Sequence, residues 1–169
     1  MGRVPRFVSV DAPFLISLAK GDPACESSVD LVSRFRLFIV VPECAVKTIL
    51  DICDNETNQA VKQAAEKARS LLPVWGFLQD GLTDVEDVIA EGAAKLIEEQ
   101  LGVTKAISRI LAEVSVHKSV LFLSDDPAII DIDSKILDVI FLDRDLSGYV
   151  TLDPSSFAEV ATKIMTRGA

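Results

Sequence analysis

The chain has 169 residues, which suits one domain with a sizeable hydrophobic core, and we expect a single domain over 1–169. Its net charge of −9 excludes a surface that attracts nucleic acid as a whole, but not a nuclease whose acidic groups are screened by metal ions. Although 49% of the residues are hydrophobic, no apolar run approaches the roughly 18 residues of a membrane helix, so we expect no membrane span.

The first predicted elements are a strand over 7–10 and a helix that follows it almost at once. The run FVSV is short and rich in β-branched residues, which is typical of a buried strand. Pro13 permits a helix to begin, and apolar residues then repeat with helical spacing until Gly21. Asp11 closes the strand. It is therefore expected at the carboxyl-terminal edge of a sheet, where open α/β sheets bind ligands.

The middle of the chain is mainly helical. We predict helices over 24–35, 43–51 and 54–72, a strand over 37–41 that ends at Pro42, and a loop or short strand over 73–78. Trp75 and Phe77 fall in the last of these segments, outside any periodic element. Together with the high hydrophobic fraction, they predict a homodimer that buries apolar surface.

The second half alternates helices with apolar runs. The capping box Thr83–Glu86 predicts a helix to Leu101. Further elements are predicted as a helix over 104–114, a strand over 120–123, a short helix, a strand over 139–142 and a last helix from Asp153 to about Thr166. Buried strands that alternate with helices predict an α/β fold with a mostly parallel sheet covered on both faces.

The cysteines and the amino-terminal segment bear on the compartment. Cys25, Cys44 and Cys53 are odd in number and lack CxxC spacing, which is typical of reduced intracellular thiols. The segment MGRVPRF is not followed by the apolar core of a signal peptide, so we expect a cytoplasmic protein. The sequence contains a single histidine, His117, so a zinc site built on several histidines is not expected, and we do not predict a catalytic role for it.

Two predicted strands end in aspartates, Asp11 on the first and the pair Asp125 and Asp126 on the later one. In a parallel sheet these carboxylates share an edge, where they would suit Mg²⁺ or Mn²⁺, since both ions prefer oxygen ligands. An alternative stays open. Asp followed by Pro within two residues is an ordinary helix N-cap, a description that Asp11 and Asp126 both fit, as does Asp153.

The order of three blocks resembles the PIN-domain family. VSVDAPFLISLAKG is similar to its opening strand, acid and leucine-rich helix; VVPECAVKTIL to its next strand, proline and helix; and SVLFLSDDPA to its later strand ending in Ser/Thr-x-Asp. The resemblance spans about 7–142 and is nearest to PIN-like proteins predicted to bind nucleic acid. It implies a three-layer α/β/α sandwich, and many family members are Mg²⁺- or Mn²⁺-dependent ribonucleases or toxins of toxin–antitoxin pairs.

The family's site is a cluster of three or four acids. By resemblance, Asp11 matches the first acid, Asp126 matches the acid after the later strand, and Asp125 lies beside it. The acid on the helix after the proline falls instead at Thr48, with Asp51 one turn further on. The acid on the helix before the later strand falls at Ser108 or, with another gap, at Lys105.

These matches and departures give two hypotheses. In the first, the chain is a metal-dependent ribonuclease in which Asp11 and Asp126 are catalytic and ligate the metal, with Asp125 and Asp51 as further ligands. In the second, it is a degenerate, non-catalytic PIN-like domain. Such a domain would bind RNA or a protein partner, such as an antitoxin-like protein.

Overall fold

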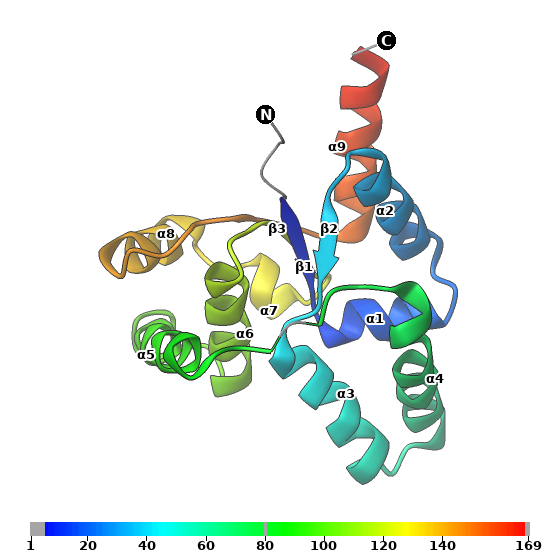
Figure 1. Cartoon of the computed structure of the whole chain (residues 1–169), viewed down its shortest axis with the longest axis horizontal. Helices are drawn as coiled ribbons and strands as arrows, with labels where there is room; N and C mark the ends of the chain where they lie inside the picture. The colour runs from blue at the N-terminus through cyan, green and yellow to red at the C-terminus, as the bar shows by residue number, and fades with distance from the viewer. Residues whose placement is uncertain (1–5, 80, 168–169) are drawn as a thin grey trace.

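The computed structural model describes residues 6–79 and 81–167, and its centre is an all-parallel sheet (Figure 1). The sheet has four strands in the order β2-β1-β3-β4. The strands are β1 (Phe7–Val10), β2 (Phe38–Val40), β3 (Ser119–Leu123) and β4 (Val150–Leu152).

Helices cover both faces of this sheet. In Figure 1, α5, α6, α7 and α8 lie on one side and α1, α2, α4 and α9 on the other, while α3 leaves from the carboxyl-terminal edge. The predicted three-layer α/β/α fold with a parallel sheet is therefore confirmed. The helices are α1 (Ala12–Ala19), α2 (Pro23–Arg34), α3 (Glu43–Asn55), α4 (Gln59–Trp75), α5 (Asp84–Leu101), α6 (Lys105–Val116), α7 (Pro127–Ile130), α8 (Ser134–Asp143) and α9 (Pro154–Arg167). No helix in the described ranges combines the length and hydropathy needed to cross a bilayer.

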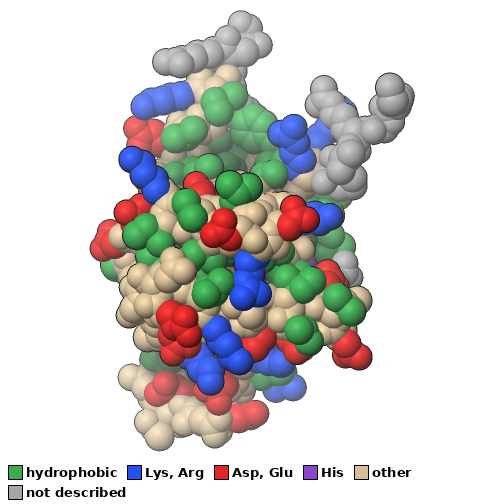
Figure 2. Space-filling view, turned by 90° about the vertical axis from the view of Figure 1, so that its left-hand side faces the viewer, with side chains coloured by type: hydrophobic (Ala, Val, Ile, Leu, Met, Phe, Trp, Pro, Cys, Tyr) green, Lys and Arg blue, Asp and Glu red, His purple; other side chains and the backbone are tan. Residues whose placement is uncertain are grey.

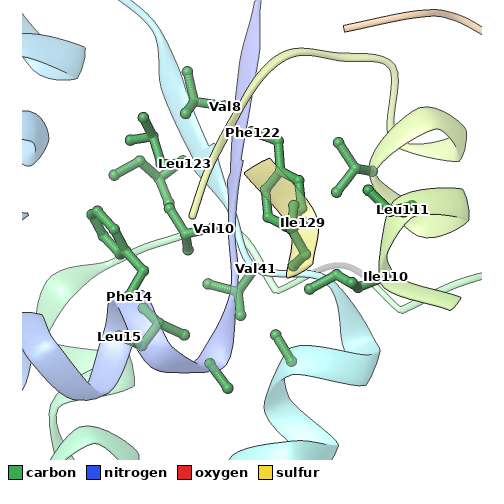
Figure 3. Packing of buried hydrophobic residues seen from close by; sticks show 14 of the residues in the cluster. Val8, Val10, Phe14, Leu15, Val41, Ile110, Leu111, Phe122, Leu123 and Ile129 are labelled. Atoms are coloured by element: carbon green, nitrogen blue, oxygen red, sulfur yellow. The ribbon is translucent and has the colours of Figure 1, made fainter. Parts of the chain in front are cut away.

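The core forms around β1, which is buried on both faces. Val8 and Val10 pack into it, and Figure 3 shows Phe14 of α1 on one side of β1 and Leu111 of α6 on the other. Between the two valines, the hydroxyl of Ser9 is hydrogen-bonded to that of Ser119 on β3 at 2.6 Å. Burial on both faces explains why this strand carries no charged residue and why its one polar side chain, the small hydroxyl of Ser9, is hydrogen-bonded within the sheet.

The predicted strand over 139–142 is wrong, because these residues lie in α8. Ile140 and Phe141 are buried, but the exposed fractions of Val139 and Leu142 are 57% and 78%. A run of four apolar residues has no periodicity that separates strand from helix. The strand that completes the sheet is β4, about ten residues later, and the sequence analysis did not predict it.

The segment over 73–78 also differs from the prediction. α4 continues through Pro73 to Trp75 and ends at Gly76, whose φ of 70° is the left-handed conformation that glycine adopts easily. Trp75 stacks on Phe77 with ring centroids 5.5 Å apart, and both pack against the core. Leu78 forms a single parallel bridge to Val40. Because these aromatic rings are packed within the chain, they no longer support the predicted homodimer, which stays a prediction.

Candidate functional site

The carboxyl-terminal ends of β1 and β3 lie side by side. The two strands are parallel neighbours, and their last residues, Val10 and Leu123, are partners in the register. The next residues along the chain, Asp11 and Ser124, therefore leave the sheet at the same edge. This confirms the prediction that the first and later strands are parallel and deliver their polar residues to one place.

Asp11 is a buried carboxylate that accepts two hydrogen bonds. Its side chain lies between the end of β1 and the start of α1 and is 3% exposed. Oδ1 accepts the backbone N–H of Phe14 at 2.9 Å, which makes Asp11 the N-cap of α1. Oδ2 accepts the hydroxyl hydrogen of Ser124 at 2.5 Å. The carboxylate thus caps a helix and also links two strands, so capping alone does not account for it.

The electrostatic setting of Asp11 disfavours its negative charge. Burial raises the pKa of Asp11 from 3.8 to about 6, the hydrogen bonds from Ser124 and Phe14 lower it, and the charges of Asp125 and Asp126 raise it. The charged form of a buried carboxyl group that lies beside other carboxylates is stabilised when a cation binds to it. A strongly shifted pKa in a cleft is also a mark of a candidate functional site.

Asp126 is linked to Asp11 through Ser124, whose hydroxyl is hydrogen-bonded to both residues. Ser124 Oγ accepts the backbone N–H of Asp126 at 3.2 Å while it donates to Asp11. Asp126 Oδ1 accepts the N–H of Ala128 at 2.9 Å and so caps α7. Its neighbour Asp125 is exposed and does not line the cleft that Asp11 and Asp126 share. Of the predicted pair, only Asp126 faces this cleft.

A cleft of about 580 Å³ opens at this edge of the sheet. Asp11 and Asp126 line it from the strand ends, and Thr48 and Asp51 line it from α3. Thr48 Oγ1 donates to the carbonyl of Cys44 at 2.9 Å, and Asp51 accepts the Asn55 side-chain amide at 2.7 Å. The structure therefore brings together three of the four predicted site carboxylates around one cleft. Within the described ranges, however, no three His, Cys, Asp or Glu residues are grouped as a metal site.

The wall formed by α6 carries no carboxylate. Ser108 is fully buried, donates to the carbonyl of Thr104 at 2.9 Å and does not line the cleft. Lys105 lines an adjoining groove instead. The α6 residues that line the cleft itself are Ala106, Ile107, Arg109 and Ile110. The departure from the acidic pattern on α6 therefore corresponds to a wall in which none of the cleft-lining residues is a carboxylate.

Arg109 is a cleft residue that the sequence analysis missed. Its guanidinium binds Glu113 at 2.8 Å, Glu91 at 3.0 Å and Asp87 at 2.5 Å. The spacing of Arg109 and Glu113, four residues apart on one helix, is a signal that could have identified this pair. The contacts with Glu91 and Asp87 join α6 to α5, which only the tertiary structure shows.

No family model and no curated protein matches this sequence. Among solved structures, the chain is similar to one in the crystal structure of VapBC2 from Rickettsia felis bound to a DNA fragment from their promoter. The TM-score is 0.55 and the identity 6%, and the match covers 87% of this chain and 98% of that one. At this identity the likeness concerns the fold alone, and it agrees with the parallel α/β architecture and a PIN-like arrangement.

Proposed function

We propose that this chain is a single-domain, PIN-like ribonuclease that uses Mg²⁺ or Mn²⁺ held by Asp11 and Asp126. The observation that carries the proposal is the shared cleft at the ends of β1 and β3, which Asp11 and Asp126 line together with Asp51 of α3. The donor set fits a hard cation, since it consists of carboxylate and hydroxyl oxygens. The raised pKa of the buried Asp11 carboxyl supports the same assignment.

Each residue has a separate part in this proposal. Asp11 binds the cation with a carboxylate that Ser124 and the Phe14 N–H hold in one orientation. Asp126 supplies the second charged ligand, and Asp51 adds negative charge from α3 across the cleft. Asp125 does not line the cleft, and its part is the negative charge that it adds near Asp11. A divalent cation held by these residues would supply a water molecule of lowered pKa and would neutralise charge on a bound phosphodiester.

The partners that we propose are RNA as substrate and an antitoxin-like protein as regulator, in the cytoplasm. The PIN resemblance supports both partners, and the fold is shared with a chain of the VapBC2 complex. We also propose that the chain forms a homodimer.

A second candidate function is a non-catalytic PIN-like domain that binds RNA or protein. The observation that favours it is the α6 wall, where Arg109 lines the cleft and none of the α6 residues that line it is a carboxylate. Asp11 and Asp126 both serve as helix N-caps, so each has a structural role without a metal.

Cleavage of single-stranded RNA in millimolar Mn²⁺ separates the two candidates. The test variant is Asp126→Asn and the matched control is Asp133→Asn, because both aspartates accept a backbone N–H two residues on at 2.9 Å, and only Asp126 lines the cleft. The ribonuclease proposal expects cleavage by the wild type and by Asp133→Asn, and its loss in Asp126→Asn. Cleavage that persists in Asp126→Asn would overturn it. RNA that stays intact with the wild-type protein would favour the non-catalytic candidate.

A further inference from the structure

Glu113 is a buried carboxylate that joins α6 to the start of α3. Its side chain is 2% exposed, although the residue lies outside the set of acids that the sequence pattern predicts. Oε1 accepts the backbone N–H of Cys44 at 3.2 Å, and Oε2 accepts the Nε–H of Arg109 at 2.8 Å. The first of these bonds connects residues that are 69 positions apart in the sequence.

The start of α3 needs such a partner. Its N-cap is Pro42, which makes no side-chain capping hydrogen bond, so the first N–H groups of α3 depend on other acceptors. The side chain of Glu43, in the first turn, is engaged instead with Lys47 at 3.2 Å and with the Leu82 N–H at 3.4 Å. Glu113 therefore acts as a cap supplied by another helix. Its negative charge is also favourable at a helix N-terminus.

Arg109 makes the burial of this charge tolerable. An unpaired buried carboxylate is strongly destabilising, whereas a paired and hydrogen-bonded one is not. Arg109 pairs with Glu113 through Nε and reaches Glu91 and Asp87 on α5 through its two other nitrogens. The arrangement fixes α5, α6 and the first turn of α3 relative to one another.

The consequence concerns the cleft. Thr48 and Asp51 lie one and two turns beyond Cys44 on α3, and both line the cleft that Asp11 and Asp126 also line. Arg109 and Ile110 line it from α6. The hydrogen bond between Glu113 and the first turn of α3 thus joins two helices that both line the cleft.

We propose that Glu113 is a positioning residue, whose carboxylate holds the first turn of α3 against α6 and so places Asp51 and Thr48 opposite Asp11 and Asp126. The link between the helices rests on the contacts above. The effect on cation binding rests on the proposed function, so the two are measured separately.

The link is tested by amide hydrogen exchange at Cys44. Glu113→Leu removes the acceptor and retains apolar volume, whereas Glu113→Gln retains one acceptor oxygen and is the variant expected to fold most readily. The control is Asp87→Asn, which removes an exposed partner of Arg109 and leaves the Cys44 contact intact. Loss of a capping bond predicts exchange at Cys44 about fivefold to tenfold faster in Glu113→Leu, and a smaller increase in Glu113→Gln. Wild-type exchange at Cys44 in both Glu113 variants would overturn the proposal.

The placement of the cleft wall is tested by the Mn²⁺ concentration at the midpoint of thermal stabilisation. We expect a several-fold higher midpoint in Glu113→Gln than in the wild type, and an unchanged midpoint in Asp87→Asn. Faster exchange at Cys44 with an unchanged midpoint would reduce Glu113 to a structural cap and overturn its positioning role. Absence of any Mn²⁺ effect on the wild type would instead contradict the proposed ribonuclease, while the exchange result would still decide the link between α3 and α6.

Discussion

Ser124 donates its hydroxyl hydrogen to the carboxylate of Asp11, and this bond joins the ends of β1 and β3 at the edge of the cleft. The same hydroxyl oxygen accepts the backbone N–H of Asp126. One serine thus sets the relative position of the two carboxylates that we propose as cation ligands.

The first prediction concerns Ser124→Ala. The variant removes a donor to a buried carboxylate, so we expect a loss of about 1–3 kcal/mol in the free energy of unfolding at pH 8. Because this hydrogen bond lowers the pKa of Asp11, its removal should raise that pKa above the present value of about 6. Denaturant unfolding and an NMR titration of Asp11 measure the two effects. An Asp11 pKa that stays the same or falls would contradict the role given to Ser124.

The second prediction is a pH dependence of stability in the absence of metal. The pKa of Asp11 is raised from 3.8 to about 6, so the folded state binds this proton more tightly than the unfolded state. Stability from this group is therefore present below about pH 4 and is lost as the pH rises through about 6. At about 1.4 kcal/mol for each pKa unit, the loss is roughly 3 kcal/mol.

The control for this pH dependence is Asp11→Asn, since asparagine is as good an N-cap as aspartate but does not titrate. The wild type should lose stability relative to Asp11→Asn between pH 4 and pH 6 in EDTA. A difference between the two proteins that does not change with pH would show that the Asp11 carboxyl is not perturbed.

A feature of this site can be predicted from the sequence when its residues are adjacent in the chain, and not when they meet only through the fold. Asp11 is predictable because a buried strand, an acid and a helix start are adjacent in the chain. Ser124 was noted only as part of a motif. Its bond to Asp11 spans 113 positions and needs the strand pairing. The same holds for the contact between Glu113 and Cys44.

The errors in the fold also have a physical cause. The run over 139–142 is apolar throughout, so its burial on one side only is invisible until α8 is seen packed against the core. β4 has only three residues, Val150–Leu152, with a polar residue at its centre, and it is the edge strand of the sheet. Edge strands are often short and partly polar, so the sequence of β4 gives little indication that it forms a strand.

The third prediction compares Gly92, within α5, with Gly102, the residue that follows the end of this helix. A Cβ at Gly92 would lie 2.7 Å from Nη1 of Arg144, the far end of a flexible side chain that can move. Gly92→Ala should therefore be neutral or stabilise the protein by up to about 1 kcal/mol, the usual preference for alanine within a helix. Gly102 ends the helix with φ 65°, so Gly102→Ala should be destabilising. Thermal unfolding of both variants checks the pair, and the opposite order would contradict the described ends of α5.

The fourth prediction is a homodimer in solution. The apolar side chains that remain exposed include Val85 and Val88 on α5 and Leu142 on α8, with exposed fractions of 70%, 71% and 78%. Figure 2 shows hydrophobic side chains scattered among charged ones on the side of the molecule that carries these helices. Burial of such surface would favour association. Light scattering at micromolar concentration should give twice the monomer mass, and a monomer would contradict the prediction.

The claim that Asp11 and Asp126 hold a divalent cation is tested most directly by the Mn²⁺-induced change in melting temperature, measured on the wild type, Asp11→Asn and the exposed-cap control Asp133→Asn. A ligand that binds only the folded state at about 100 times its dissociation constant stabilises it by about 2.7 kcal/mol. We predict a rise in melting temperature for the wild type and for Asp133→Asn, and its loss in Asp11→Asn. A wild-type melting temperature that does not respond to Mn²⁺, or an equal rise in Asp11→Asn, would contradict the cation site.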